Sequence, residues 1–411
     1  MAERSAIIYM EYFTAFPAAY VFDESGGERF PCFGGDPMEN HTLCIPCLFG
    51  LEGLVGEEMR RLDMEDVQVV DRRVYFSGGA DAIARANLNC RMGERVMLRL
   101  AEFEVHSFED LFQGVKSAPL EQWIPADGAF PVKGYSLSSQ LHSVPDCQSI
   151  VKKAAADRLG EYYGLDWLPE TGSVFQLRFS IMKDVCELFL DTSGLSLHKR
   201  GYRAVSNEAP LHETMAAAMV TLARYRGREY LWDPFCGSGT IVIEAALIAL
   251  NRAPGLGRSF AAQNWPSVPQ EVWARAKEEA RDREFHGNYR ILGTDSDPHT
   301  LGIAISNAKK AGVGKLIEFR EADATRMSPP TNRGVIVTNP PYGERMMERK
   351  SAQKLYRTLG KHWRFTDGWD KYILSSEPEF EYYYGARAAK KRKLYNGRLQ
   401  CNVYMYLPNR K

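Results

Sequence analysis

The fold is decided by the stretch Tyr230-Leu231-Trp232-Asp233-Pro234-Phe235-Cys236-Gly237-Ser238-Gly239-Thr240. A short strand-like run ends at Asp233, a glycine loop follows, and residues 241–250 have the apolar periodicity of a helix. Gly237 and Gly239 allow a tight turn and a close approach of the backbone to a ligand, which the helix N-terminus then faces. This order predicts a ligand-binding unit of a parallel α/β sheet. The loop is not a nucleoside-triphosphate P-loop, because no Gly-Lys-Ser/Thr closes it.

Two later strands are each predicted to end in an acid. Asp295 ends residues 290–295 and can accept hydrogen bonds from both hydroxyls of a ribose; a helix-leading capping acid is the alternative. Asp323 ends residues 318–323 and can accept from an adenine amine, or it is a solvated loop acid. In a dinucleotide fold the ribose acid lies ~20 residues after the glycines. Here 295 − 239 gives 56 residues, so an insertion is needed, and residues 253–288 supply one.

A buried strand over residues 335–338 is predicted to deliver Asn339-Pro340-Pro341-Tyr342 to the sheet edge where α/β folds bind ligands. The Asn339 amide oxygen and the Pro340 carbonyl are two acceptors in a segment made rigid by proline. Together they can take both hydrogens of an exocyclic NH2 group. Pro341 fixes the turn, and Tyr342 offers a ring on which a flipped base can stack. A plain Pro-Pro turn is the weaker alternative, because two strand-end acids precede it.

These segments occur together in one family. The chain resembles the class I S-adenosylmethionine-dependent methyltransferases that act on planar amines. Within them it is similar to the THUMP-domain RNA methyltransferases that modify guanine N2 in large-subunit ribosomal RNA, a group with the older label putative N6-adenine DNA methylase. The resemblance covers residues 41–411. Besides the glycine loop it rests on His198–Arg203, Ala209–Thr214, Asn339–Arg345, Arg392–Gly397, Phe130–Gly134 and Ser143–Gln148.

The resemblance implies S-adenosylmethionine as the cofactor and assigns residues to it. The methionine part is expected on Asp233, Pro234, Cys236, Gly237, Ser238, Gly239 and Thr240. The ribose is expected on Asp295, and the adenine on Asp323 and Ala324. The target amine is expected on Asn339, Pro340, Pro341 and Tyr342. His212 stands where the family usually has lysine, which puts a role for that position in doubt.

The predicted fold class is α/β, with a Rossmann-like class I methyltransferase sheet preceded by a smaller α+β THUMP-type RNA-binding module. We expect residues 41–170 to form a ferredoxin-like plus THUMP module, 171–199 a connecting β-hairpin, and 200–411 the methyltransferase domain. Residues 1–40 are the expected N-terminal extension, outside the resemblance, and residues 1–37 within it show no sustained periodicity. They are interpreted as an extension, either loosely attached or preceding a natural start at Met38.

RNA contacts are predicted from local basic segments, because the chain is neutral overall, with 52 Lys and Arg against 52 Asp and Glu. Neutrality excludes a protein that coats polyanions in bulk but allows a basic patch. From Tyr382 to the C-terminus there are eight basic residues and no acid. Interleaved aromatic residues favour a nucleic-acid edge over a solvated tail. The predicted RNA contacts are Arg200, Arg203, Lys390, Lys391, Arg392, Lys393 and Tyr395.

The composition is that of an ordinary globular protein, with 45% hydrophobic and 25% charged residues. No apolar run approaches the ~20 residues of a membrane helix, so no membrane association is expected. Eight scattered cysteines indicate a reduced, cytoplasmic protein rather than a disulfide framework. Cys44 and Cys47 form a lone Cys-x-x-Cys, interpreted as buried strand cysteines, and no metal is expected.

The expected activity is methyl transfer to the N2 amine of a guanosine in RNA, which the resemblance makes 23S ribosomal RNA. Rival hypotheses are adenine-N6 methylation of DNA, glutamine methylation of a protein, and a catalytically silent RNA-binding protein. The strand-end acids and the Asn-Pro-Pro-Tyr segment argue against silence. The THUMP-like module argues for RNA over DNA. The sequence indicates no oligomeric state.

Overall fold

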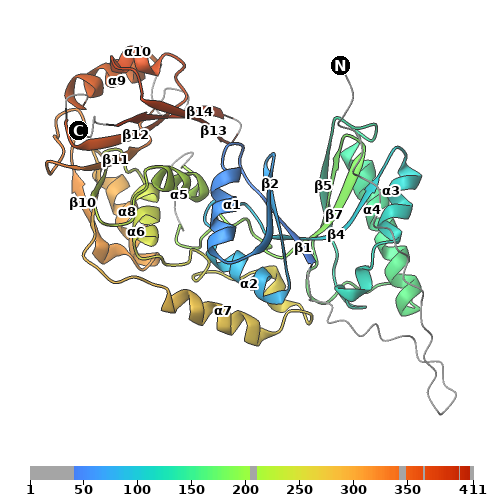
Figure 1. The fold of residues 1–411 in the computed structure, drawn as a ribbon. Coiled ribbons are helices and arrows are strands. Elements are labelled where there is room, and N and C mark those ends of the chain that lie inside the picture. The colour runs from blue at the N-terminus through green and yellow to red at the C-terminus, as the bar shows by residue number, and fades with distance from the viewer. Residues whose placement is uncertain (1–40, 204–210, 342–348, 364–365, 398, 408–411) are drawn as a thin grey trace, which may run out of the picture. The chain divides into compact units, whose positions relative to one another are not determined.

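The structure is a computed structural model that describes residues 41–203, 211–341, 349–363, 366–397 and 399–407. The predicted extension of residues 1–40 and the predicted base-stacking residue Tyr342 lie outside the described residues. Within the described part, the strands form two seven-stranded sheets with helices packed on them (Figure 1). The predicted fold class, a Rossmann-like sheet preceded by a smaller α+β module, is confirmed.

The N-terminal sheet has the order β2-β3-β1-β4-β7-β6-β5 and is antiparallel except for the pair β5 and β6. The predicted hairpin forms as β6 and β7, and β7 pairs with β4, so the hairpin is an integral part of this sheet. The strands are β1 (His41–Pro46), β2 (Glu65–Val70), β3 (Arg73–Gly78), β4 (Met97–Glu104), β5 (Val132–Leu137), β6 (Leu177–Met182) and β7 (Val185–Asp191). The helices are α1 (Glu52–Arg61), α2 (Ala80–Asn89), α3 (Phe108–Lys116) and α4 (Val144–Tyr163).

Alternation along β1 separates two groups of buried side chains. Leu43 and Ile45 join the main core, whereas Cys44 between them joins a small cluster with Met97 and Phe189. Cys44 and Cys47 are buried free thiols, and burial raises the pKa of the Cys44 thiol to about 12. A thiol kept neutral in this way behaves as a small apolar side chain.

The C-terminal sheet has the order β10-β9-β8-β11-β12-β14-β13. The neighbours from β10 to β12 are parallel, and β14 is antiparallel to both β12 and β13. Because the chain leaves β8 toward β9 and β10 and returns to β11, the carboxyl ends of β8 and β11 form the switch point where such sheets bind ligands. The strands are β8 (Tyr230–Asp233), β9 (Arg290–Asp295), β10 (Ile317–Glu321), β11 (Gly334–Thr338), β12 (Trp369–Ser375), β13 (Lys390–Asn396) and β14 (Leu399–Tyr406).

Helices cover both faces of this sheet. Leu231 of β8 belongs to the core shared with α5 (Glu213–Leu222) and α6 (Thr240–Ala249). The next residue, Trp232, points to the other face, where its ring centroid lies 5.8 Å from that of Trp363 in α9 (Arg349–Trp363). The helix α8 (Pro298–Lys310) contacts α6, and α10 (Phe380–Tyr384) contacts α9. Figure 1 shows α9 and α10 on one side of β11, β12 and β14, with α5 and α6 on the other.

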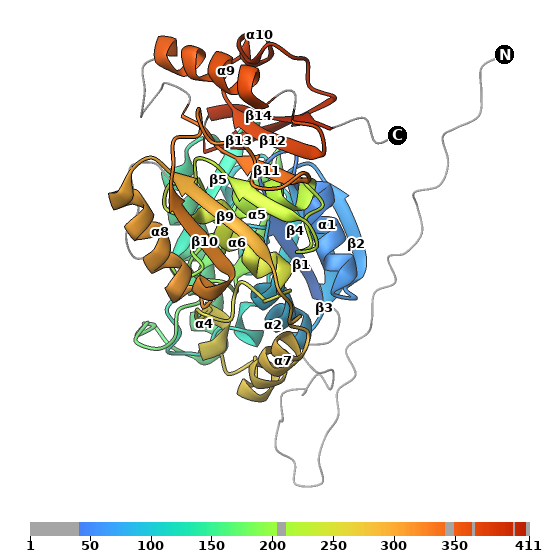
Figure 2. The same ribbon diagram turned by 90° about the vertical axis from the view of Figure 1, so that its left-hand side faces the viewer.

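The predicted insertion contains α7 (Gln270–Asp282), which packs on α2 of the N-terminal module (Figure 2). Trp273 of α7 is buried and stacks on Phe260, with ring centroids 5.4 Å apart. Arg275 of α7 pairs with Asp81 of α2. The insertion therefore joins the two parts of the chain.

Three short 3-10 helices complete the described elements: Leu120–Gln122, Ala261–Asn264 and Gly314–Leu316. Across the residues that the structure describes, no helix combines the length and apolar character needed to cross a membrane.

Candidate active site

The carboxyl ends of β8 and β11 are joined by a buried hydrogen bond. Thr338, the last residue of β11, donates from Oγ1 to Oδ1 of Asp233, the last residue of β8, over 2.7 Å. The same oxygen accepts from the backbone N–H of Phe235 at 3.2 Å. Both Asp233 and Thr338 are buried. This bond fixes the glycine loop against the segment that begins at Asn339.

The protonation of Asp233 is finely balanced. Burial raises the pKa of its carboxyl to about 7, and nearby Asp295 acts in the same direction, whereas the Thr338 hydroxyl and the Phe235 N–H lower it. Near neutral pH both forms are therefore populated. A cationic group placed beside the carboxyl would favour the ionised form.

The two glycines of the loop have different roles. Gly237 has a φ of +54°, and a Cβ built there would meet no atom within 4 Å. Gly239 has a φ of +85°, and its Cβ would lie 3.1 Å from the Cβ of Ala304 in α8. Both glycines adopt the left-handed backbone; Gly239 is also required by packing, whereas Gly237 leaves open space at the backbone, as close approach of a ligand requires.

The rest of the loop is held by the neighbouring strand and helix. The Cys236 N–H donates to the Thr294 carbonyl of β9 at 2.9 Å. The Ser238 carbonyl accepts from Nδ2 of Asn307 in α8 at 3.0 Å. Pro234, Cys236 and Ser238 are all buried. These contacts keep the loop in one conformation.

Asp295 lies at the tip of β9 and contacts the glycine loop directly. Its Oδ2 accepts from the Gly237 N–H at 3.0 Å, and its Oδ1 accepts from the Asp297 N–H at 3.1 Å. Since a carboxylate oxygen can accept two hydrogen bonds, each oxygen keeps one acceptor position. The cap of α8 is Asp297, whose carboxylate accepts from the His299 N–H at 3.0 Å. Asp295 is therefore left for another partner.

Asp323 follows β10 and is exposed. Its Oδ1 accepts from the N–H and the hydroxyl of Thr325, at 2.8 and 2.7 Å. The Thr325 hydroxyl is the main cause that lowers the pKa of the Asp323 carboxyl. The adjacent Ala324 is buried in the core on the α9 side of the sheet. An ionised acceptor therefore stands beside a small apolar surface.

Asn339 carries an unsatisfied acceptor. Its Oδ1 is buried and has no hydrogen-bond partner among the residues that the structure describes. Such an atom costs free energy unless a ligand or another donor satisfies it. The following turn is anchored, because the carbonyl of Pro341 accepts from the hydroxyl of Tyr356 in α9 at 2.9 Å.

The residues at this edge fit S-adenosylmethionine. The cofactor presents an ammonium, a sulfonium, ribose hydroxyls and an adenine amine. Against these the site offers the carboxyls of Asp233, Asp295 and Asp323 and the open backbone at Gly237. Cations and hydrogen-bond donors on the ligand thus match an acceptor-rich set in the protein.

Arg200 was predicted to contact RNA; its side chain is buried and held by other residues of the protein, and the RNA contact stays a prediction. Its Nη1 donates to the Leu197 carbonyl at 2.7 Å, and its Nη2 donates to the Arg91 carbonyl. Its Nε lies 3.5 Å from Oε1 of Glu244 in α6. Arg200 therefore links the segment after β7 to α6.

Arg203 joins the starts of two helices. Its Nη2 donates to Oγ1 of Thr240, the first residue of α6, at 2.6 Å, and to the Leu211 carbonyl at 3.1 Å. Its Nε lies 3.5 Å from Oε1 of Glu213, the first residue of α5. Thr240, which the resemblance assigns to the cofactor loop, is thus held by a residue of the preceding segment.

The basic residues of β13 divide into two pairs. Lys391 forms an ion pair of 2.8 Å with Glu381, and Arg392 donates to the Gly50 carbonyl from Nε at 3.1 Å. Lys390 and Lys393 are exposed. The Lys393 ammonium also lies 5.5 Å from the ring centroid of Tyr395. Arg392 therefore fastens β13 to the N-terminal module, whereas Lys390 and Lys393 have no ion pair within the described residues and can meet a ligand.

Two residues that position the site, Thr338 and Tyr356, were not predicted from the sequence. Thr338 could have been noticed as the last strand residue before Asn339. Nothing in the sequence marks Tyr356, which is a buried residue of an amphipathic helix and also accepts from the Ser375 hydroxyl at 3.3 Å.

The strand order, the glycine loop and the acids at the strand tips define a class I S-adenosylmethionine-dependent methyltransferase. Comparison with known families agrees. Residues 42–97 match the RlmL ferredoxin-like domain, residues 105–191 the THUMP domain, and residues 200–405 the RMKL-like methyltransferase domain. The chain belongs to the RMKL-like methyltransferase family.

Two relatives illustrate the match. The chain is 41% identical over 372 residues to the putative RNA methyltransferase YpsC of Bacillus subtilis, which covers 90% of this chain and 96% of the relative. It is 35% identical over 373 residues to the ribosomal RNA large subunit methyltransferase K/L of Psychromonas ingrahamii, which covers 88% of this chain and 49% of the relative. The chain spans about half the length of the K/L relatives.

Solved structures share the fold over most of the chain. A Listeria monocytogenes protein described as a predicted N6-adenine-specific DNA methylase is 43% identical, with a TM-score of 0.86, covering 91% of this chain and 97% of that one. SMU.472, a putative methyltransferase complexed with SAH, is 37% identical, with a TM-score of 0.86, covering 91% and 99%. SAH is what remains of S-adenosylmethionine after methyl transfer, in agreement with the cofactor expected here.

Proposed function

We propose that this protein methylates RNA, transferring the methyl group of S-adenosylmethionine to the exocyclic N2 amine of a guanosine in 23S ribosomal RNA. The THUMP match supports an RNA substrate, as do the names of the YpsC and K/L relatives. A ribosomal RNA substrate supports a cytoplasmic location, as do the buried free thiols of Cys44, Cys47 and Cys90 among the described residues.

The observation that carries the catalytic proposal is the buried Oδ1 of Asn339, which has no hydrogen-bond partner in the described part of the chain. An NH2 group is the ligand that satisfies such an acceptor. We assign Asn339 and the Pro340 carbonyl to the two N–H groups of the guanine amine, with Pro341 fixing the turn and Tyr342 stacking on the base. Asp233, the glycine loop, Asp295, Asp323 and Ala324 are assigned to the cofactor.

The chain's own residues act by position and charge. The guanine N2 lone pair is conjugated into the ring and is weakly nucleophilic. Acceptance of both N–H groups makes this nitrogen more electron-rich and holds it in one orientation. The Thr338–Asp233 bond and the Tyr356–Pro341 bond keep the acceptors fixed relative to the cofactor loop. The cofactor supplies an electrophilic methyl carbon on a good leaving group.

The chain is proposed to divide as the sequence indicates, with residues 41–170 as the ferredoxin-like and THUMP module and 200–411 as the methyltransferase domain. The hairpin of residues 171–199 completes the sheet of the module. The module contributes RNA affinity and no chemistry, and the methyltransferase domain supplies the chemistry.

The test is nucleoside mass spectrometry with a trideuterated methyl donor. Wild-type protein is incubated with a large-subunit rRNA transcript or with duplex DNA, and labelled nucleosides are quantified. We expect labelled N2-methylguanosine in RNA. Asn339→Ala should lower kcat about 10²–10³-fold, as the loss of one preorganised polar contact at a reacting group does.

Asn332→Ala is the matched control, because Asn332 is exposed and precedes the same strand. It should keep wild-type activity. Label in adenine of DNA, or no label in any nucleoside, would overturn the proposed function. Full activity of Asn339→Ala would refute the assignment of Asn339 as an acceptor for the target amine.

A further inference from the structure

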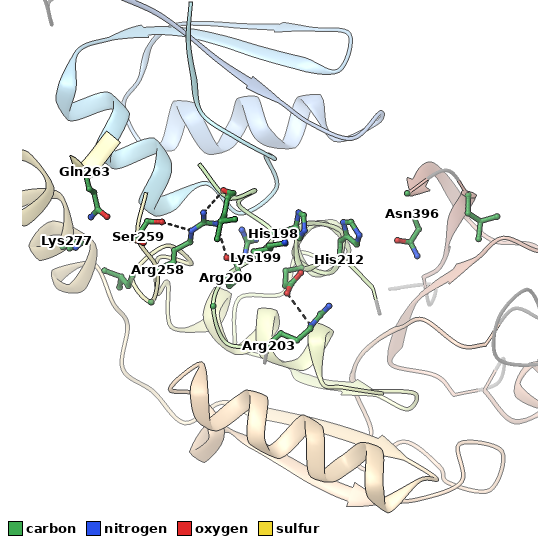
Figure 3. Close-up of a pocket in the computed structure, with 17 residues that line it drawn as sticks. His198, Lys199, Arg200, Arg203, His212, Arg258, Ser259, Gln263, Lys277 and Asn396 are labelled. Atoms are coloured by element: carbon green, nitrogen blue, oxygen red, sulfur yellow. Dashed lines mark hydrogen bonds and ion pairs between the residues drawn. The ribbon is translucent and has the colours of Figure 1, made fainter. Parts of the chain in front are cut away.

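A large pocket borders Arg203 and does not include the strand-end acids. It has a volume of about 1420 Å³ and is lined by the segment 195–203, the loop 256–259, Lys277 of α7, the start of α5 and the turn between β13 and β14 (Figure 3). Sites for small molecules measure roughly 300–1,000 Å³. This pocket therefore suits a larger ligand.

The pocket is positively charged. Its lining contains five Lys and Arg residues and one carboxylate, that of Glu213. Arg200 and Arg203 are paired with Glu244 and Glu213, respectively, but no ion pair joins the other three cations to any carboxylate in the described ranges. Those three are Lys199, Lys277 and Arg258.

Arg258 is fixed in place and remains charged. Its Nη1 donates to the carbonyls of Ser196 and Lys199 at 2.6 and 3.0 Å, and its Nη2 donates to the Leu195 carbonyl at 2.6 Å. Burial is the main cause that lowers its pKa to about 10, and the neighbouring Arg200 acts in the same direction. At neutral pH it is a cation held by neutral carbonyls. An anionic ligand would supply the missing charge.

One wall of the pocket is a pair of stacked imidazoles. The rings of His198 and His212 lie with centroids 4.6 Å apart and planes at 28° (Figure 3). Burial and the neighbouring His212 lower the pKa of His198 to about 4, and burial and Arg203 lower the pKa of His212. Both rings are therefore neutral near pH 7 and form a flat, uncharged surface on which a nucleobase can stack.

The pocket is connected to the catalytic edge through Arg203. This residue lines the pocket and donates to Thr240 at the end of the glycine loop. A ligand in the pocket is therefore adjacent to the loop that we assign to the cofactor.

We propose that this pocket binds a single-stranded segment of the substrate RNA, with phosphates at Lys199, Lys277 and Arg258 and one base on the His198–His212 stack. The proposal rests on the proposed function, because it takes RNA as the substrate. A polyanion that carries planar groups satisfies both the unpaired cations and the flat wall. An acidic protein would pair with the three cations but would have no base to stack on the imidazole wall.

The charge test uses Lys199→Gln combined with Lys277→Gln in the full chain. Binding of a fluorescein-labelled single-stranded RNA is measured by anisotropy over a range of salt concentrations. The slope of the logarithm of the binding constant against the logarithm of the salt concentration, here called the salt slope, should become less steep by about 1.4. This corresponds to ~0.7 for each lost phosphate contact. Lys309→Gln with Lys315→Gln is the matched control, because both lysines are exposed and lie outside the pocket. It should leave the slope unchanged.

The stacking test compares His198→Phe with His198→Ala. Phenylalanine keeps a flat ring and should retain most of the RNA affinity, whereas alanine should lower it roughly tenfold. Binding of S-adenosylmethionine, measured in parallel, should be unaffected in every variant and shows that the fold is intact.

Three results would overturn the pocket assignment: a wild-type salt slope in the lysine double variant, equal losses in the lysine control, or equal affinities of the two His198 variants. Poly-glutamate that binds as tightly as RNA, with the same loss in the double variant, would identify a general anion site instead. The proposed function fails separately, through the absence of labelled N2-methylguanosine. A pocket variant that regains the wild-type rate at saturating RNA would leave that function standing.

Discussion

Asp295→Ala should raise the dissociation constant of S-adenosylmethionine by about 10- to 150-fold. The two Asp295 oxygens already accept from the N–H groups of Gly237 and Asp297, so one acceptor position on each oxygen is left for the ribose. A hydrogen bond to a charged group contributes about 1.5–3 kcal/mol, and every 1.4 kcal/mol is about tenfold in affinity. Asp295→Asn keeps one acceptor oxygen and should fall between alanine and the wild type.

The assay is isothermal titration calorimetry with S-adenosylmethionine, and Asp297→Ala is the control. Asp297 caps α8 through the His299 N–H and the Thr300 hydroxyl but is not assigned to the ribose. Its removal should lower the melting temperature slightly, through the loss of the helix cap, and leave cofactor affinity unchanged. Wild-type affinity in Asp295→Ala would refute the ribose assignment. Equal losses of affinity in both variants would attribute the effect to the loop conformation alone.

Two further predictions concern the same edge. Because the pKa of Asp233 rises from an ordinary 3.8 to about 7 on folding, its contribution to stability is complete below pH 3.8 and is lost as the pH rises to 7. Urea denaturation should therefore show that the free energy of unfolding of Asp233→Asn, relative to that of the wild type, increases across that pH window. A difference that stays constant with pH would contradict a raised pKa at Asp233. Gly239→Ala should lower the melting temperature more than Gly237→Ala, because its Cβ would press on Ala304 at 3.1 Å, whereas the Cβ at Gly237 is unopposed and costs only the left-handed backbone, ~1–2 kcal/mol. Equal melting temperatures would show that the loop shifts to relieve the contact.

The sequence predicted which strand ends meet at this edge of the sheet, because the residues there are set by local rules. A turn-forming or helix-capping residue follows each of the three strands, which end at Asp233, at Asp295 and just before Asn339. Parallel strands of one sheet bring such ends together, so the prediction needed only the strand order. The length of the insertion could be predicted from the sequence, but its packing on α2 could not.

The basic residues could not be assigned in this way, because each partner is distant in sequence. Arg200 is buried through Glu244, 44 residues later, and Arg392 reaches the carbonyl of Gly50, 342 residues earlier. A charge run has no periodicity that separates exposed cations from structural ones. The pocket was missed for the same reason, since Lys199, Arg258 and Lys277 come together only in the folded chain.

Under the proposed function, the contacts between the N-terminal module and the methyltransferase domain bear on how the target guanosine is selected. The Gly255 N–H donates to the Leu88 carbonyl at 2.9 Å, and Nη2 of Arg91 donates to the Arg252 carbonyl at 2.8 Å. Together with α7 on α2, these contacts form a continuous packed and hydrogen-bonded join rather than a flexible linker. RNA bound to the module would therefore present nucleotides to Asn339 at a fixed spacing. Selection of the target then depends on RNA shape as well as on the base, because a guanosine at the wrong distance cannot reach the acceptor.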